Sequence, residues 1–73
     1  MNWREHIFSD PQVLRGKPCI KNTRIPVALI LGYLADGRDT AAIQGEFPDL
    51  IADDVAACLD YARELAEFEA AEA

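Results

Sequence analysis

The fold is decided by residues 16–27, which read GKPCIKNTRIPV. Cationic side chains lie here among turn-forming residues and apolar residues, and a long apolar run begins directly afterwards. Proline, glycine and asparagine mark turns in the chain. The stretch therefore indicates a basic, ordered arm in front of a small helical core. This layout suits a module that holds a polyanion or a partner protein, and it does not suit an enzyme.

A small β hairpin is predicted inside this arm. Cys19-Ile20 and Arg24-Ile25 flank Lys21-Asn22-Thr23, and Asn tolerates the left-handed conformation that tight turns require. Two strands alone are marginal in water. We therefore expect this hairpin to pair with Ile7-Phe8, or with the same strand of a second subunit. Residues 11–16 read as a loop or a single turn of helix.

The first predicted helix follows the arm. Pro26 suits its first position, the run of residues 27–35 is apolar almost all round, and Asp36-Gly37 ends it. A helix of this composition is buried on every side. In so small a chain, we expect one side to face the core and another to face a second subunit, with Gly32 allowing a close approach.

Two further helices are predicted. A short one runs from a cap at Asp39 or Thr40 to about Glu46, and a longer one begins near Ala52. The longer helix has an apolar stripe with spacings of three and four, formed by Ile51, Val55, Cys58, Leu59, Ala62, Leu65 and Ala66. Residues 68–73 are expected to fray.

These elements predict one domain over residues 1–73, with a β arm at 1–26 and a three-helix bundle at 27–73. The fold class is mostly α, with the element order of a helix-turn-helix. A chain this short buries only about 60% of the surface that its unfolded form exposes. Small folds of this kind need staples or a partner subunit, so we expect a homodimer.

Cysteine usage points to the cytoplasm. Cys19 and Cys58 are the two cysteines, and no secretory leader precedes them, so a reducing compartment is expected. Both are interpreted as buried apolar residues. His6 is the single histidine, so no metal site, cofactor or catalytic group is predicted. No apolar run approaches the roughly 18 residues of a membrane span.

Charge divides the chain. Residues 1–26 carry five Lys and Arg against two acids, a net charge of +3, whereas residues 27–73 carry two against eleven, a net charge of −9. Such asymmetry gives information about partners rather than about fold. The acidic half has a plainer interpretation as a set of solvated helix faces.

Several short motifs resemble a bacterial family, domain-of-unknown-function family number 433, whose members include VapB-like antitoxins. The matching positions of the arm are Gly16, Pro18, Ile20, Thr23, Arg24, Ile25 and Val27. Further along, they are Gly37, Ile43, Pro48-Asp49-Leu50 and Leu59-Asp60-Tyr61-Ala62. Asn22 and Ile51 depart from the pattern, since Gly and a Ser or Thr cap are usual there. The missing cap costs about 1 kcal/mol unless Asp49 replaces it.

The resemblance implies a homeodomain-like fold and an antitoxin that pairs with a PIN-like ribonuclease toxin. Binding to operator DNA, by the antitoxin alone or in the toxin complex, is implied as well. Two other classes stay open: a stand-alone helix-turn-helix-like DNA-binding transcriptional regulator without a toxin, and an interaction domain that binds neither partner.

For DNA, the candidate residues lie in the arm, where clustered cations can neutralise phosphates. They are Arg15, Lys17, Lys21, Asn22, Thr23 and Arg24. Two of them have a structural alternative, because Arg24 can pair with Asp36 or Asp49 and Thr23 can satisfy the turn. A recognition-helix role is disfavoured for the last helix, which would present two carboxylates, Asp53 and Asp54, to phosphate.

For the toxin, the candidate residues lie on the last helix: Tyr61, Arg63 and Phe68. An Arg can pair with the metal-binding acids of a PIN-type site, and aromatic side chains anchor interfaces. Tyr61 and Phe68 can instead line a homodimer seam. The helix also carries four glutamates that can either imitate RNA or form a solvated face: Glu64, Glu67, Glu69 and Glu72.

Overall fold

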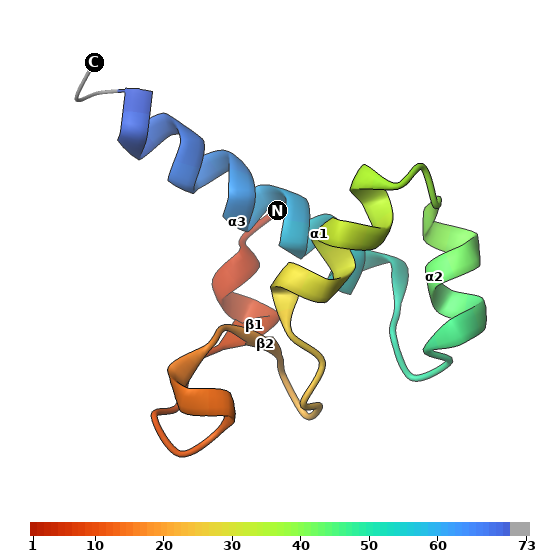
Figure 1. Ribbon diagram of the computed structural model, residues 1–73, viewed down its shortest axis with the longest axis horizontal. Coiled ribbons are helices and arrows are strands. Elements are labelled where there is room, and N and C mark those ends of the chain that lie inside the picture. Colours follow the sequence, from red (N-terminus) through yellow and green to blue (C-terminus); the bar gives the residue numbers. More distant parts are fainter. Residues whose placement is uncertain (71–73) are drawn as a thin grey trace.

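The computed structural model describes residues 1–70, and of these the side chains of residues 1–68. Figure 1 shows how their helices and strands are arranged. In chain order the elements are η1 (Trp3–Glu5), β1 (Ile7–Phe8), η2 (Leu14–Gly16), β2 (Cys19–Ile20), α1 (Val27–Ala35), α2 (Thr40–Glu46) and α3 (Ala52–Ala70), where η marks a 3-10 helix. The protein is therefore mostly helical, with a small antiparallel sheet, as the sequence predicts.

β1 and β2 form the sheet. Ile7 lies opposite Ile20 in antiparallel register. On its other side β2 contacts the chain beyond the turn, where the Ile20 N–H donates to the Ile25 carbonyl at 3.0 Å. Asn22 takes the left-handed conformation in this turn, with φ of 65°. The predicted hairpin is therefore confirmed only in part: the turn forms and an isolated bridge joins Cys19 to Pro26, but residues 24–25 are not a strand. The expected pairing with Ile7-Phe8 is confirmed, within the same chain.

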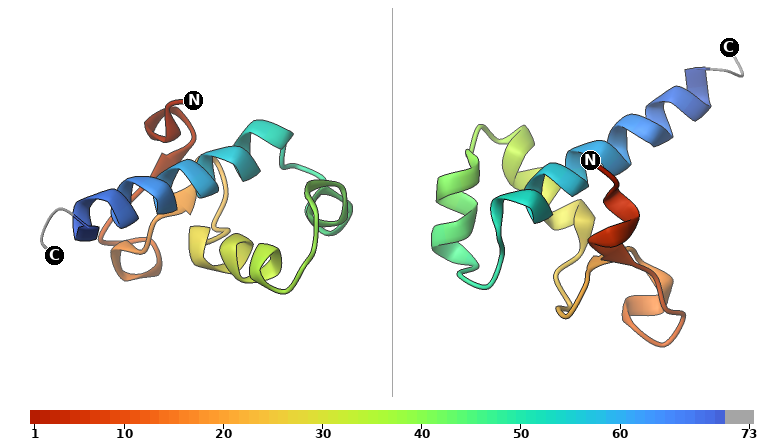
Figure 2. Two further views of the ribbon diagram at one scale, coloured as in Figure 1. Left: turned by 90° about the horizontal axis from the view of Figure 1, so that it is seen from above. Right: turned by 180° about the vertical axis from the view of Figure 1, so that it is seen from behind.

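One core joins the N-terminal segment to the helices. α3 runs along one side of the molecule and packs against η1, β1, α1 and α2 (Figure 2). The buried apolar residues come from both strands, all three α-helices and the segment before α3: Ile7, Cys19, Ile20, Val27, Ile30, Ile43, Leu50, Val55, Ala57 and Cys58. The β arm is thus part of the packed body and not an appendage to it.

The predicted stripe of α3 is only partly correct. Val55 and Cys58 are buried, but Leu59 and Leu65 are 51% and 50% exposed, and Ile51 is 55% exposed. Leu59 follows Cys58 directly, so it points about 100° away around the helix. Leu65 lies on the Cys58 side, but there α3 extends beyond the rest of the molecule (Figures 1 and 2). The helix continues through Ala70, where fraying was expected, and residues 71–73 lie outside the described part.

α1 also differs from its prediction. Val27 and Ile30 are fully buried, whereas Leu29 is 40% exposed, so burial on every side is wrong for the single chain. Gly32 has open space around it within the single chain, so the close approach of a second subunit there stays a prediction. Pro26 precedes the helix as its N-cap. The predicted stop is confirmed, because Gly37 has φ of 90° and its N–H donates to the Leu34 carbonyl.

Side chains cap the two later helices. The Asp39 carboxylate accepts the Ala42 N–H at 2.9 Å at the start of α2. At the start of α3, the Asp54 carboxylate reaches back and accepts the Ile51 N–H at 3.0 Å. Asp54 thus forms one half of a capping box, which is a different bond from the one that a Ser or Thr at position 51 would make to a first-turn N–H. Within residues 1–70, no helix is both long enough and apolar enough to cross a bilayer.

Candidate macromolecule-binding surfaces

Four of the five cations in residues 1–26 lack a carboxylate partner in the described part of the chain. Arg15, Lys17, Lys21 and Arg24, which we call the basic arm, are all exposed, and none forms an ion pair within the described residues. The pairing of Arg24 with Asp36 or Asp49 that the sequence left open is absent there. A cation without a protein partner remains available for a phosphate.

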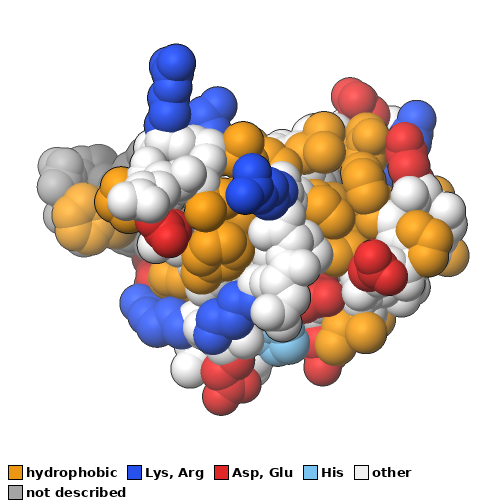
Figure 3. All heavy atoms as spheres, turned by 90° about the horizontal axis from the view of Figure 1, so that it is seen from below, with side chains coloured by type: hydrophobic (Ala, Val, Ile, Leu, Met, Phe, Trp, Pro, Cys, Tyr) orange, Lys and Arg blue, Asp and Glu red, His pale blue; other side chains and the backbone are white. Residues whose placement is uncertain are grey.

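The other arginines differ from the basic arm in this respect. Each forms an ion pair with a carboxylate: Arg4 with Glu64 at 3.0 Å, Arg38 with Glu46 at 2.6 Å, and Arg63 with Asp60 at 2.9 Å. On the face drawn in Figure 3, Lys and Arg side chains lie in several separate groups around exposed apolar side chains. The positive charge is thus displayed, but it does not form one continuous block.

Thr23 acts within the turn. Its hydroxyl donates to the Ile20 carbonyl at 2.7 Å and accepts the Ile25 N–H at 3.0 Å. Both hydrogen bonds hold the hydroxyl inside the turn. This supports the alternative in which Thr23 has a structural role. Asn22 supplies the left-handed residue of the same turn and leaves its side chain exposed.

The tip of the turn lies in an acid-lined groove. Lys21, Asn22 and Thr23 line a depression of about 460 Å³ together with His6, Ile51 and three acids, Glu5, Asp49 and Asp54. A phosphate entering this groove would meet three carboxylates against one ammonium group, so the local field opposes it. Lys21 therefore differs from Arg15 and Lys17 of the basic arm, because it alone among these three lines a groove with carboxylates.

A contact between His6 and Asp54 forms one wall of this groove, and the sequence did not predict it. His6 Nδ1 lies 3.1 Å from Asp54 Oδ1, and both side chains are mostly buried. Asp54 also caps α3 through the Ile51 N–H. The spacing of Ile51 and Asp54 is that of a capping box, which is the one sequence signal for this carboxylate's position.

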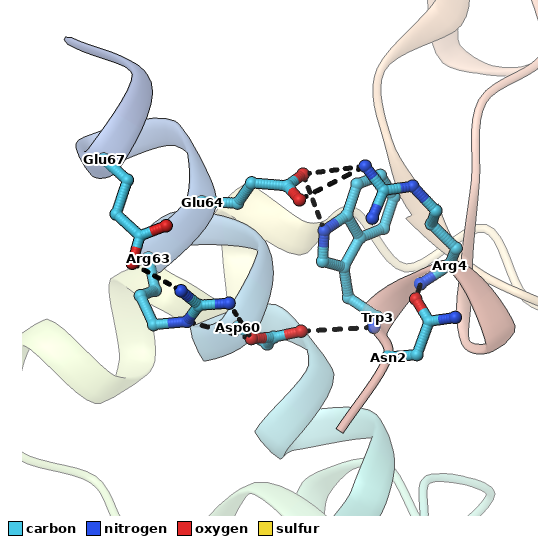
Figure 4. A network of polar contacts seen from close by, with 7 residues as sticks. All are labelled: Asn2, Trp3, Arg4, Asp60, Arg63, Glu64 and Glu67. Carbon is cyan, nitrogen blue, oxygen red and sulfur yellow. Dashed lines mark hydrogen bonds and ion pairs between the residues drawn. The ribbon is translucent and has the colours of Figure 1, made fainter. Parts of the chain in front are cut away.

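A polar network fastens the N-terminus to the middle of α3 (Figure 4). The Trp3 backbone N–H donates to Asp60 at 3.3 Å, and its indole N–H donates to Glu64 at 3.0 Å. Arg4 donates to both oxygens of Glu64 and lies 4.4 Å from the centre of the Trp3 ring. The network covers one side of α3 with η1.

Arg63 belongs to the same network. Its guanidinium donates to Asp60 and, at 2.6 Å, to Glu67, while its side chain stays 57% exposed. The hydrogen bond from Arg63 is the largest influence on Asp60 and holds the pKa of that carboxyl below its ordinary value. Any outside carboxylate that recruits Arg63 must therefore compete with these two acids.

The two predicted aromatic anchors, Tyr61 and Phe68, differ in how exposed they are. Tyr61 is half-buried, and the Trp3 ring packs edge-on against it with ring centres 4.8 Å apart. Phe68 is 68% exposed on the projecting end of α3. Of the residues predicted for toxin binding, Phe68 is thus open, Arg63 is exposed but paired, and Tyr61 is covered by the N-terminal segment.

Neither cysteine is placed for chemistry. Cys19 and Cys58 are free thiols and fully buried. Burial, and to a smaller extent the Asp54 charge, raises the pKa of Cys58 to about 12. Over the described part of the chain, no group of three or more His, Cys, Asp or Glu side chains is arranged to hold a metal ion.

Comparison with known proteins places the chain in a family. The family described as Protein of unknown function (DUF433) matches residues 7–62. The crystal structure of a DUF433 member protein from Anabaena variabilis matches with a TM-score of 0.77 and 32% identity, over 90% of this chain. This chain spans 65% of the length of that protein. No curated protein matches. The chain therefore belongs to the DUF433 family.

Proposed function

We propose that the protein is the antitoxin of a type II toxin–antitoxin pair and that it binds and inhibits a PIN-like ribonuclease. The observation that carries the proposal is the projecting end of α3, where Leu65 and Phe68 are 50% and 68% exposed. An apolar helix face that the chain itself leaves uncovered is what the groove of a partner protein accepts. We further propose that α1, α2 and α3 form a homeodomain-like unit.

Arg63 is proposed to act on the acidic metal site of the ribonuclease. Its guanidinium is exposed at the start of the projecting segment and can donate hydrogen bonds to new carboxylates once Asp60 and Glu67 release it. The pair with Glu67 is exposed on both sides and is worth only about 0–1 kcal/mol, whereas Asp60, whose side chain is 14% exposed, is the stronger competitor for Arg63. In this proposal Phe68 anchors the partner and Arg63 neutralises its acids.

The experiment is co-expression with the product of a neighbouring PIN-like gene, followed by size-exclusion chromatography. We expect one complex to elute and the ribonuclease to be silent in it. Leu65→Ala/Phe68→Ala should weaken the complex about ten-fold or more, as expected for hot-spot residues. Leu59→Ala, an equally exposed position on another side of α3, is the matched control. Separate elution of the two wild-type proteins would contradict the proposal.

A second candidate function is that of a stand-alone DNA-binding regulator, and the unpaired cations of the basic arm favour it. The same surface would let the antitoxin contact its operator. We propose that the DNA-binding form is a homodimer, for which the exposed Leu29 side of α1 is the available seam. Fluorescence polarisation on the upstream promoter fragment at two salt concentrations tests DNA binding, and light scattering of the eluted protein tests the dimer.

A further inference from the structure

The loop between the two strands has an unusual backbone at its tip. Leu14, Arg15 and Gly16 have φ of 48°, 58° and 82°, so three successive residues are left-handed, two of them with side chains. Hydrogen bonds from Gly16 N–H to the Val13 carbonyl and from Lys17 N–H to the Leu14 carbonyl close the turn at 3.0 and 3.2 Å. Left-handed conformations cost energy in residues with a Cβ. Residues 14–17, which we call the knuckle, are therefore held in one conformation by their own backbone hydrogen bonds.

The strained knuckle displays its side chains outward. Leu14 is 41% exposed, and the cations on either side of the Gly, Arg15 and Lys17, are exposed without an ion pair in the described residues. The three side chains line a shallow hollow of about 300 Å³. One acid of the loop, Asp10, is occupied as an acceptor for the Gln12 N–H. The knuckle thus combines one apolar side chain with two free positive charges.

From this combination we infer that the Leu14–Lys17 knuckle enters the minor groove of DNA, with Leu14 as an apolar wedge between base pairs. The inference rests on the DNA-binding function proposed above and names the part of DNA that is contacted. Minor-groove proteins pair Arg or Lys in the groove with an inserted apolar side chain. A narrow minor groove also has an enhanced negative potential, which attracts Arg and Lys.

The rest of the molecule favours this site over the alternatives on the same chain. The N-terminal end of α3 carries Asp53 and Asp54, and the turn at Lys21 lies among three carboxylates. Both surfaces repel phosphate more than the knuckle does. An anionic membrane is the other polyanion that an apolar and cationic tip could meet. A single buried leucine contributes only about 1.5–3 kcal/mol, and stable anchoring needs more than one such signal.

The test measures fluorescence polarisation of a labelled A/T-rich duplex, with netropsin as a minor-groove competitor and methyl green as a major-groove competitor. We expect netropsin, and not methyl green, to displace the protein. Arg15→Ala/Lys17→Ala should lower the salt slope by about 2, close to one unit per lost phosphate contact. Leu14→Ala should weaken binding roughly three- to ten-fold and leave the slope unchanged.

Arg38→Ala and Leu59→Ala serve as matched controls, because Arg38 is already paired with Glu46 and Leu59 is an equally exposed leucine elsewhere. Duplex binding by the wild type that neither knuckle variant alters overturns the inference and leaves the DNA-binding function standing. Displacement by methyl green alone does the same. No duplex binding by the wild type overturns both. Sedimentation with phosphatidylserine vesicles that Leu14→Ala abolishes, without duplex binding, assigns the knuckle to membranes instead.

Discussion

Asp60 shows how much one side chain can organise in a small protein. One carboxylate oxygen accepts the backbone N–H of Trp3, and the other accepts two hydrogen bonds from Arg63. The bonds from Arg63 and, to a smaller extent, from Trp3 favour the charged form and lower the pKa, while partial desolvation opposes them. The N-terminal segment and the orientation of Arg63 therefore depend on the same ionised group.

The lowered pKa of Asp60 predicts how stability changes with pH. The unfolded chain keeps the ordinary aspartate pKa of 3.8, and the folded value lies below it. The contribution of Asp60 is therefore complete above the unfolded pKa and is lost as the pH falls through the folded pKa. Urea unfolding from pH 7 down to pH 2 should show a smaller loss in Asp60→Asn than in the wild type. Asp36→Asn, at an exposed position, should follow the wild type.

The buried thiols give a second prediction at this scale. With its pKa raised to about 12, Cys58 provides almost no thiolate at pH 8, and both sulfurs are buried away from the reagent. We expect neither thiol to react with Ellman's reagent within minutes in the native protein. Both should react at once in guanidinium chloride. Rapid labelling of the native protein would show that the core opens around Cys19 or Cys58.

At the scale of elements, α2 is the helix most dependent on its cap. It has only seven residues, and its one fully buried side chain is Ile43. The Asp39 carboxylate satisfies the Ala42 N–H, and loss of such a cap costs about 0.5–2 kcal/mol. Asp39→Ala should lower the free energy of unfolding by about 1 kcal/mol in urea. Asp36→Ala, which removes an exposed acid just beyond α1, should change it by less than about 0.5 kcal/mol.

The elements themselves could largely be predicted from sequence, because their signals are local. Asp39 at a helix start, Gly37 at a helix end and Asn22 in a tight turn each act over a few residues. The exposure of Leu65 could not be predicted in this way. Periodicity identifies the apolar side of α3, but it does not indicate how far the rest of the molecule extends along that side.

The same contrast between local sequence signals and long-range packing applies to the candidate binding surfaces. Whether a cation is surrounded by acids depends on which carboxylates come near it in the folded structure. Arg15 and Lys17 are exposed, whereas Lys21 shares a groove with Asp49 and Asp54. The acids around Lys21 come from segments far along the chain, and the contact of His6 with Asp54, 48 positions apart, is one that brings those segments together. The sequence therefore identified the cations, and the packing of distant segments determined which of them lie in acid-poor surroundings.

For the whole molecule, Trp3 is a reporter of cooperative folding. It is the only tryptophan, and it packs edge-on against Tyr61 of α3 while its indole N–H donates to Glu64. If η1 and α3 unfold together, the urea transitions by Trp fluorescence and by far-ultraviolet circular dichroism should coincide. An earlier fluorescence transition would show that the N-terminal segment detaches first.

The size of the core predicts a narrow margin of stability. Ile30 is fully buried at the centre of a core that gathers side chains from both halves of the chain. Ile30→Ala should cost about 2–5 kcal/mol, a large part of the stability of a domain this small. We expect Tm to fall sharply or the thermal transition to disappear. Leu59→Ala, at an exposed position, should leave the transition within a few degrees of the wild type.

The contact between Trp3 and α3 also has a consequence for biosynthesis. Trp3 is translated well before its hydrogen-bond partners on α3, Asp60 and Glu64, which follow it by 57 and 61 positions. The N-terminal segment cannot complete its packing until this part of α3 has left the ribosome. The native state therefore cannot build up vectorially, because its earliest segment waits for its latest helix.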